Sequence, residues 1–278
     1  MRIVTFASGS TGNCTLISDG NTHILVDAGI SMRRITNCLS RLSLTMQDIA
    51  GVLITHEHRD HVAALATMIK RSKINFFAPR TVANHLRFSL AGIDDRMNII
   101  IPGKTFSVKD MTVTAFNTSH DTDESVGYRI SGSALIGYCT DTGCVTDAMV
   151  AALSGVSAAV IEANHDEDML RYGSYPYFLK RRVLSEHGHL SNAACGVFAA
   201  FLCQSGAEKF ILAHLSRENN RPELALNTVC KYLKENGFSP EVSVAPMDGF
   251  CIVEVEGGLP DCSELSSSAA ESCVRGIT

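Results

Sequence analysis

The stretch GVLITHEHRDHV (Gly51–Val62) decides the fold of this chain, because an apolar run leads directly into a cluster of titratable side chains. Its first four residues read as a buried strand. The eight residues that follow, Thr55–Val62, hold three histidines, a glutamate, an arginine and an aspartate. Gathering so many polar groups at the end of a buried strand costs desolvation free energy unless a partner offsets it.

A bound divalent metal is the partner that this pattern predicts. In an extended loop the side chains of His56 and His58 point to the same side, and Asp60 and His61 begin the next helix, where they can face the same point. Neutral imidazoles and carboxylates are ligands that borderline divalent ions accept. We prefer this interpretation to the alternative, a solvated loop that happens to be rich in histidine.

Further metal donors are predicted where other apolar runs end. FNTSH ends at His120, GYCTD ends at Asp141 and FILAH ends at His214. Each alone is typical of an ordinary strand end, but together with the first cluster they complete two sites. The predicted arrangement has two divalent ions, zinc or manganese, with Asp141 bridging them: His56, His58 and His120 on one, and Asp60, His61 and His214 on the other. Two such ions can share a hydroxide and stabilise both the attacking and the leaving oxygen.

The composition is that of a globular protein. The chain has 278 residues, of which 45% are hydrophobic and 19% charged, and no apolar run reaches the roughly 18 residues of a membrane span. Its first residues lack the long apolar region of a secretory signal, so we expect a cytoplasmic protein with no membrane partner. The net charge of −5 argues against a surface that is generally suited to polyanions, but not against a local site.

The order of elements predicts an α/β fold in two halves. Strands alternate with amphipathic helices, which favours an αββα sandwich of two mixed sheets flanked by helices. We expect one helix after Ser31, one continuous helix carrying Val62, Leu65 and Met68, and one capped by Ser191. Residues 1–256 form a single predicted domain. Residues 257–278 lose periodicity and are rich in glycine, serine and acids, and we predict a disordered tail.

These motifs carry a resemblance to a known family. The HxHxDH run with its separate His, Asp and His ligands resembles the metallo-β-lactamase fold. The further motifs resemble its YycJ (WalJ) branch, whose members are regarded as DNA-processing nucleases: SGSTGN, VDAG, SHD, VGY, TDTG, EANHDEDML, SYPYFLKRRV and GHLSN. The similarity covers nearly all of residues 1–255. It implies a metal-dependent hydrolase of phosphodiester bonds in nucleic acid, DNA more than RNA, and a 5′–3′ exonuclease.

The resemblance also implies catalytic roles. A metal-bridging hydroxide, steered by Asp60, would attack phosphorus. By similarity to tRNA-processing members of the superfamily, His189 with Glu162 would assist the leaving oxygen. The alternative is that Glu162 is a strand-end carboxylate in a buried network and that His189 is an ordinary loop residue.

Substrate-binding residues are predicted around GHLSN. Ser191 can cap a helix whose positive end faces an anionic oxygen, and Asn164 is a candidate beside it. Lys180, Arg181 and Arg182 lie just upstream and could follow phosphates, although such runs are equally typical of solvated helix faces.

Two other functions stay open on the residues alone. The same ligand set serves hydrolases of thioesters and other small esters, although those usually carry a separate helical domain for which this chain has no room. A catalytically silent metal-binding partner protein would also use this scaffold, but it has no need of seven ligands around an open site.

Overall fold

Two seven-stranded sheets form the centre of the computed structural model, which describes residues 1–257. The predicted tail, residues 257–278, lies outside the described residues apart from Gly257, and its disorder stays a prediction. The order of strands in the first sheet is β14 (Cys251–Glu254), β1 (Arg2–Ala7), β2 (Cys14–Asp19), β3 (Thr22–Val26), β4 (Ile49–Leu53), β5 (Phe76–Pro79) and β6 (Met97–Ile100). The order in the second is β13 (Glu241–Val244), β12 (Lys209–Ala213), β11 (Ala158–Glu162), β10 (Leu135–Cys139), β9 (Val126–Ser131), β8 (Met111–Asn117) and β7 (Thr105–Val108).

Both sheets are mixed, and their pairings run in the same order. In the first sheet β14, β1, β2 and β3 pair antiparallel, and β3, β4, β5 and β6 pair parallel. In the second, β7 to β10 pair antiparallel, and β10 to β13 pair parallel. The two halves expected from the sequence are therefore two sheets of similar design.

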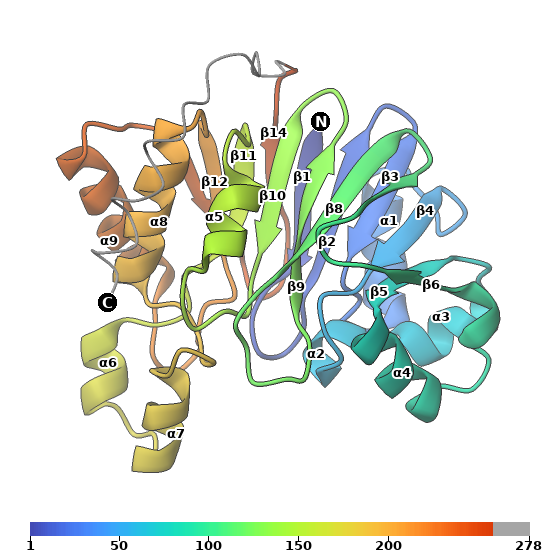
Figure 1. The fold of residues 1–278 in the computed structure, drawn as a ribbon, viewed down its shortest axis with the longest axis horizontal. Coiled ribbons are helices and arrows are strands. Elements are labelled where there is room, and N and C mark those ends of the chain that lie inside the picture. Colours follow the sequence, from blue (N-terminus) through green and yellow to red (C-terminus); the bar gives the residue numbers. More distant parts are fainter. Residues whose placement is uncertain (258–278) are drawn as a thin grey trace.

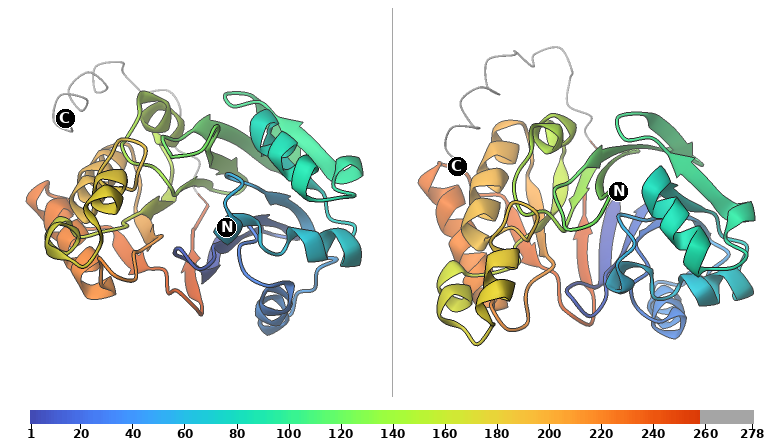
Figure 2. Two further views of the ribbon diagram at one scale, coloured as in Figure 1. Left: turned by 90° about the horizontal axis from the view of Figure 1, so that it is seen from below. Right: turned by 60° about the horizontal axis from the view of Figure 1, so that its bottom comes forward.

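Helices cover the outer faces of both sheets (Figures 1 and 2). The side of the first sheet carries α1 (Met32–Arg41), α3 (Leu65–Arg71) and α4 (Arg80–Ser89), and the side of the second carries α5 (Asp147–Leu153), α8 (Asn192–Gln204) and α9 (Pro222–Glu235). Three short elements lie near one edge, α2 (Arg59–Val62), α6 (Glu167–Tyr172) and α7 (Tyr177–Val183), and a 3-10 turn precedes β6 (Asp94–Arg96). The predicted αββα sandwich is confirmed.

Alternation of side chains along the strands produces three apolar layers. Ile3 of β1 packs between the two sheets, whereas its neighbour Val4 packs under the helices of the first half. A third layer joins the second sheet to α5, α8 and α9. Burial on both faces explains why most of the strands read as continuous apolar runs.

Two helices begin at serine caps, as the sequence predicted. The hydroxyl of Ser31 accepts a hydrogen bond from the Arg34 N–H at 3.3 Å, and Ser191 caps α8 in the same way through Ala194. The single helix predicted through Val62, Leu65 and Met68 is wrong, since the chain forms α2 and α3 separately. Between them the Ala64 N–H donates to the Ala28 carbonyl at 2.9 Å, which ties the backbone to the loop after β3.

Among the described residues, no helix is long and apolar enough to cross a membrane.

Candidate metal centre

The polar side chains predicted from strand ends meet at one edge of the molecule. The loop after β4 and α2 supplies the HxHxDH residues, while His120, Asp141 and His214 follow β8, β10 and β12. These elements belong to both sheets, and the edge lies near α2, at the bottom of Figure 1. The centre is therefore built at the seam between the two halves.

The donor atoms form overlapping groups in which they lie within 4.8 Å of one another. One group comprises His56, His58 and His120, and a second comprises Asp60, His61 and His214. Asp141 connects them, because its Oδ2 is 3.4 Å from His61 Nε2 and its Oδ1 is 3.7 Å from His120 Nε2. The structure thus brings all seven predicted ligands together.

Buried atoms at this centre lack a hydrogen-bond partner. His56 Nε2, His214 Nε2 and Asp141 Oδ2 are buried and have no hydrogen bond within residues 1–257. A buried polar atom without a partner is costly, and divalent ions bound among these donors would satisfy such atoms. The residues present therefore fit a divalent metal.

Each of four histidines has its other ring nitrogen held by the protein. His61 Nδ1 lies 2.8 Å from Asp27 Oδ2, and His56 Nδ1 lies 3.0 Å from the Thr55 hydroxyl. His120 Nδ1 contacts the Gly188 carbonyl at 3.1 Å, and His214 Nδ1 contacts a carboxylate oxygen of Glu162 at 2.9 Å. Such contacts fix the ring orientation and turn Nε2 toward the cluster.

Asp27 is a site residue that the sequence reasoning missed. It follows β3, is fully buried and accepts hydrogen bonds from the Thr55 N–H and hydroxyl as well as contacting His61. Its backbone adopts a φ of 61°, in the left-handed region. The rule that found the other donors, a polar residue at the close of an apolar run, would also have found Asp27.

The SGSTGN hairpin and the VDAG turn hold the HxHxDH loop from the opposite side. The Asn13 N–H donates to the Asp60 carbonyl at 2.8 Å, and the Asn13 amide nitrogen lies 3.0 Å from His61 Nε2. A Cβ at Gly29 would lie 1.6 Å from the Asp60 carbonyl oxygen. Glycine at that position is what allows the turn to approach the loop so closely.

Glu162 joins two histidines through one buried carboxylate. Its Oε1 lies 2.8 Å from His189 Nδ1 and 2.9 Å from His214 Nδ1, and its Oε2 accepts the Thr142 N–H at 2.9 Å. Burial raises the pKa of Glu162, but His189 and His214 outweigh that effect and lower it to about 2. The carboxylate is therefore ionised at neutral pH and orients His189 toward the cluster.

The predicted substrate-binding residues lie beside this centre in different settings. Asn164 donates to the His214 carbonyl at 2.8 Å, and the Ser191 hydroxyl is engaged in the α8 cap. Lys180 donates to the Arg171 carbonyl at 2.9 Å, Arg182 forms an ion pair with Asp121, and Arg181 is exposed.

A small pocket of about 190 Å³ opens onto the centre. Its lining includes His189, His214, Asn164 and Arg182. It therefore joins the metal-competent cluster to α7, where the predicted basic run lies.

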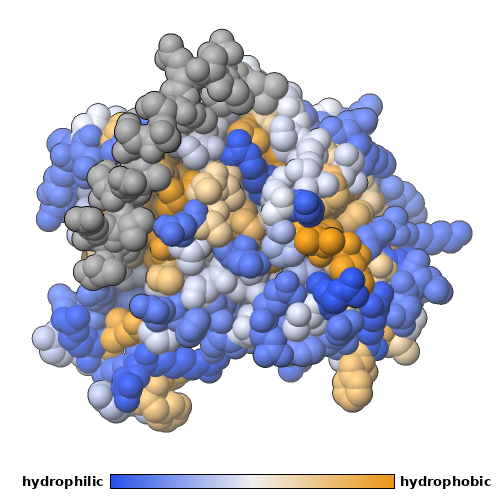
Figure 3. All heavy atoms as spheres, viewed as in Figure 1, coloured by the Kyte–Doolittle hydropathy of each residue, from blue (hydrophilic) through white to orange (hydrophobic). Residues whose placement is uncertain are grey.

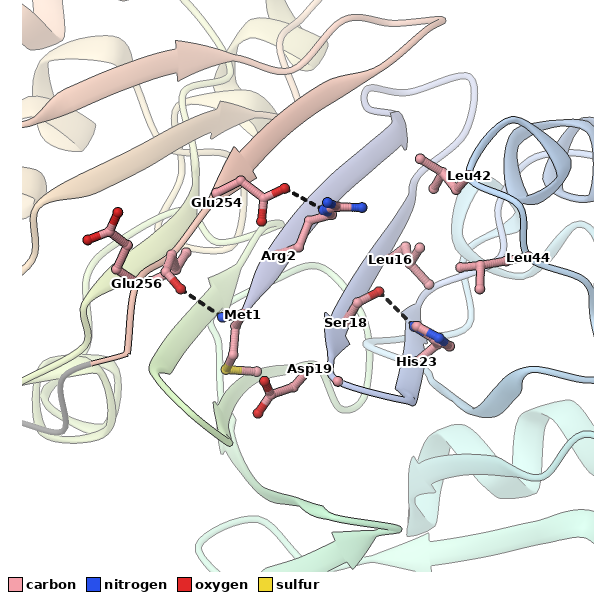
Figure 4. Close-up of a pocket in the computed structure, with 12 residues that line it drawn as sticks. Met1, Arg2, Leu16, Ser18, Asp19, His23, Leu42, Leu44, Glu254 and Glu256 are labelled. Atoms are coloured by element: carbon pink, nitrogen blue, oxygen red, sulfur yellow. Dashed lines mark hydrogen bonds and ion pairs between the residues drawn. The ribbon is translucent and has the colours of Figure 1, made fainter.

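Larger pockets lie elsewhere. One of about 390 Å³ is lined by Met1, Arg2, His23 and Glu254 among others (Figure 4), and His23 there contacts the Ser18 hydroxyl at 2.9 Å. Another, of about 590 Å³, lies where β4 and β5 begin, at the strand ends opposite the centre. Of the metal-competent groups found in residues 1–257, none includes a lining residue of either pocket.

Comparison with known proteins supplies the family. Residues 22–215 match the model of the β-lactamase superfamily domain. The chain belongs to that superfamily. With the cluster of histidine and carboxylate donors at the seam of its two sheets, it is a metal-dependent hydrolase of the metallo-β-lactamase fold, as the resemblance implied.

Two relatives confirm the resemblance to the YycJ (WalJ) branch. The chain is 35% identical over 234 residues to the exodeoxyribonuclease YycJ of Bacillus anthracis, covering 84% of this chain and 89% of that protein. It is 34% identical over 233 residues to the exodeoxyribonuclease WalJ of Streptococcus pneumoniae, covering 82% and 87%. The crystal structure of Zn²⁺-bound PqqB from Methylobacterium extorquens shares the fold, with a TM-score of 0.70 at 17% identity and coverage of 92% and 100%.

Proposed function

We propose that the protein is a dinuclear metal-dependent phosphodiesterase that acts on DNA as an exonuclease, in the 5′–3′ direction. The observation that carries the proposal is the group of seven buried or half-buried donors at the seam of the two sheets. Two relatives named exodeoxyribonucleases support the choice of DNA.

The ligand assignment of this proposal follows the groups of donor atoms. One zinc or manganese ion would be held by His56, His58 and His120, and the other by Asp60, His61 and His214. Asp141 would serve both sites, since its two oxygens face different histidines. When bound, the ions supply a water of lowered pKa as nucleophile and stabilise the charge that develops on the phosphoryl oxygens.

The chain's own residues then orient the reaction. Asp60 Oδ2, which lies 3.5 Å from His61 Nε2 and 3.7 Å from His214 Nε2, accepts a hydrogen bond from the attacking water. His189, held through Nδ1 by Glu162, presents its other ring nitrogen to the leaving oxygen and donates a proton to it. Glu162 is the positioning residue of that pair.

The substrate is held next to the small pocket. Asn164 lines this pocket on the leaving-oxygen side. The start of α8, capped by Ser191, lies next to His189 in the chain, and the positive end of that helix favours an anionic oxygen. Lys180, Arg181 and Arg182 contact the phosphates farther along the strand. Because the net charge of −5 is unfavourable for DNA, the positive charge has to be local.

The test is to incubate the full chain, loaded with manganese or zinc, with end-labelled single-stranded DNA, duplex DNA and matched RNA. We expect stepwise shortening of DNA from the 5′ end, abolished in His58→Ala and retained in the control His23→Ala, whose imidazole lies in the pocket of Figure 4. Cleavage of small esters or thioesters without any nucleic-acid product would replace the proposal with an esterase. Two bound ions without turnover of any ester would leave a silent metal-binding partner protein.

A further inference from the structure

The short helices α6 and α7 expose aromatic side chains beside the centre. Tyr172 has 82% of its surface exposed, Tyr177 has 76% and Phe178 has 73%. Large aromatic side chains usually bury most of their surface, and exposed ones that gather in one place mark binding sites. We call residues Arg171–Arg182 the α6–α7 arm.

The α6–α7 arm is also strongly basic. It contains four cationic side chains, Arg171, Lys180, Arg181 and Arg182, whereas the whole chain has a net charge of −5. Arg171 pairs with Glu167, at the start of α6, at 3.5 Å. Three of the four, the arginines, are exposed. Aromatic and cationic side chains therefore lie close together on one projecting segment, and this combination can contact unpaired bases and phosphates at the same time.

The arm leads into the centre. Tyr175, Leu179 and Arg182 line the same small pocket as His189 and His214. In Figure 1 the two helices project below the second sheet on the edge that carries α2, and Figure 3 shows hydrophobic spheres protruding from an otherwise hydrophilic surface there. A strand lying on the arm would reach the leaving-oxygen side of the proposed reaction.

The arm is held in place by contacts within it and to the rest of the protein. Lys180 Nζ donates to the Arg171 carbonyl at 2.9 Å, which joins α7 to α6. Arg182 forms an ion pair with Asp121, the neighbour of His120, and a Cβ at Gly173 would lie 2.9 Å from the Asn219 side chain. The exposed rings therefore stand on an anchored support, so their binding costs little conformational entropy.

We propose that the α6–α7 arm is a stacking platform for single-stranded DNA. Unpaired bases stack on Tyr172, Tyr177 and Phe178, and the arginines contact the intervening phosphates. A base pair inside a duplex has no free ring face to offer, so the arm selects strands with unpaired ends. This inference rests on the proposed function, since it names the form of DNA that reaches the centre.

The experiment measures binding of the full chain to labelled oligonucleotides by fluorescence anisotropy. Phosphorothioate linkages keep the strand intact, and a single strand is compared with a blunt duplex of the same sequence. We expect Tyr177→Ala/Phe178→Ala to weaken binding to the single strand by about tenfold or more, because each stacked base contributes about 1–3 kcal/mol. Binding of the blunt duplex should stay within about twofold. The matched control is Phe88→Ala on α4, which removes a ring that is 97% exposed but lies outside the arm.

A second readout comes from the tyrosines. The chain has no tryptophan, and three of its six tyrosines lie in the arm, so stacking of bases quenches a large part of the intrinsic fluorescence. A plot of the logarithm of the single-strand binding constant against the logarithm of the salt concentration has a negative slope. Arg181→Ala should make that slope shallower by about 0.7, because one phosphate contact is lost.

Two outcomes would overturn the platform. One is single-strand binding that is unchanged in Tyr177→Ala/Phe178→Ala. The other is a wild-type dimer in sedimentation that becomes a monomer in this variant, which would assign the rings to a second copy of the chain. A wild type that binds single strands through the arm but cleaves no phosphodiester would instead refute the proposed function alone.

Discussion

Asp27 and His61 form a contact that is closed to solvent: their Oδ2 and Nδ1 atoms are 2.8 Å apart, and both side chains are 0% exposed. Burial lowers the pKa of His61, but Asp141 and Asp27 outweigh that effect and hold the pKa well above its ordinary value. The carboxylate of Asp27 therefore sets which ring nitrogen faces the cluster.

Replacing Asp27 by asparagine should weaken metal binding without removing a ligand. The amide keeps the shape but loses the charge that holds the His61 ring, and loss of such a partner typically costs about 10- to 100-fold in metal affinity. Competition with a chromophoric chelator measures it. Asp95→Asn, an exposed aspartate in the 3-10 turn before β6, is the control. Equal affinity in both variants would show that Asp27 serves the fold alone.

Metal binding should release protons at one site and not at the other. Burial lowers the pKa of His214, but Asp141, Asp60 and Glu162 more than compensate and raise it to about 10 in the metal-free chain, so a metal must displace its proton. Burial lowers the pKa of His56 and of His120, so these rings are already neutral.

The sign of the pH dependence follows. As pH rises toward 10, fewer protons have to leave, and affinity at the Asp60, His61 and His214 group should increase. Calorimetry in buffers with different enthalpies of protonation should find net proton release for one of two ions. Equal proton release on binding of both ions would contradict the predicted difference between the two groups of donors.

The loss of kcat on replacing His189 should depend on whether the leaving group needs a proton. With DNA, whose leaving alkoxide needs a proton, His189→Ala should lower kcat by about 10²- to 10⁴-fold. With a p-nitrophenyl phosphodiester, whose leaving group departs without a proton, the loss should be small. At saturating metal, Glu162→Gln should show the same contrast, because Glu162 orients His189. Saturation is needed because Glu162 also contacts the proposed ligand His214. A loss of equal size on both substrates would indicate a structural role.

Tyr128 supports the strand that carries the HxHxDH loop. Its hydroxyl is buried and donates to the Ile54 carbonyl at 2.5 Å. Tyr128→Phe leaves that carbonyl without its partner, which should cost about 1–3 kcal/mol of unfolding free energy. A melt should show a Tm lower by about 2–4 °C for each kcal/mol. The half-buried Tyr232→Phe is the control, and equal melting of both variants would contradict the prediction.

The sequence was most informative where burial and function coincide. A histidine or aspartate that ends an apolar run has to lie at a sheet edge, so His120, Asp141 and His214 could be placed together before the structure was known. Ser191 could be placed as a helix cap for a similarly local reason.

What escaped the sequence depends on long-range contacts. The break between α2 and α3 arises from the bond of Ala64 to Ala28, 36 positions earlier, and no local pattern encodes it. Helix α5 and the strands β6 and β7 are short and were not predicted. Asp27 closes an apolar run as His120 does, so the sequence could have made it a candidate, but its contact with His61 is visible only in the structure.

The last described strand has a consequence for biosynthesis. β14 follows β13 of the second sheet, yet it pairs antiparallel with β1 in the first, with Arg2 opposite Glu254. The edge of β1 is therefore open while all seven proposed metal ligands are already synthesised, and it closes only when residue 254 has left the ribosome. During that interval the nascent chain presents an unpaired strand to its surroundings, and truncation before β14 would make that exposure permanent.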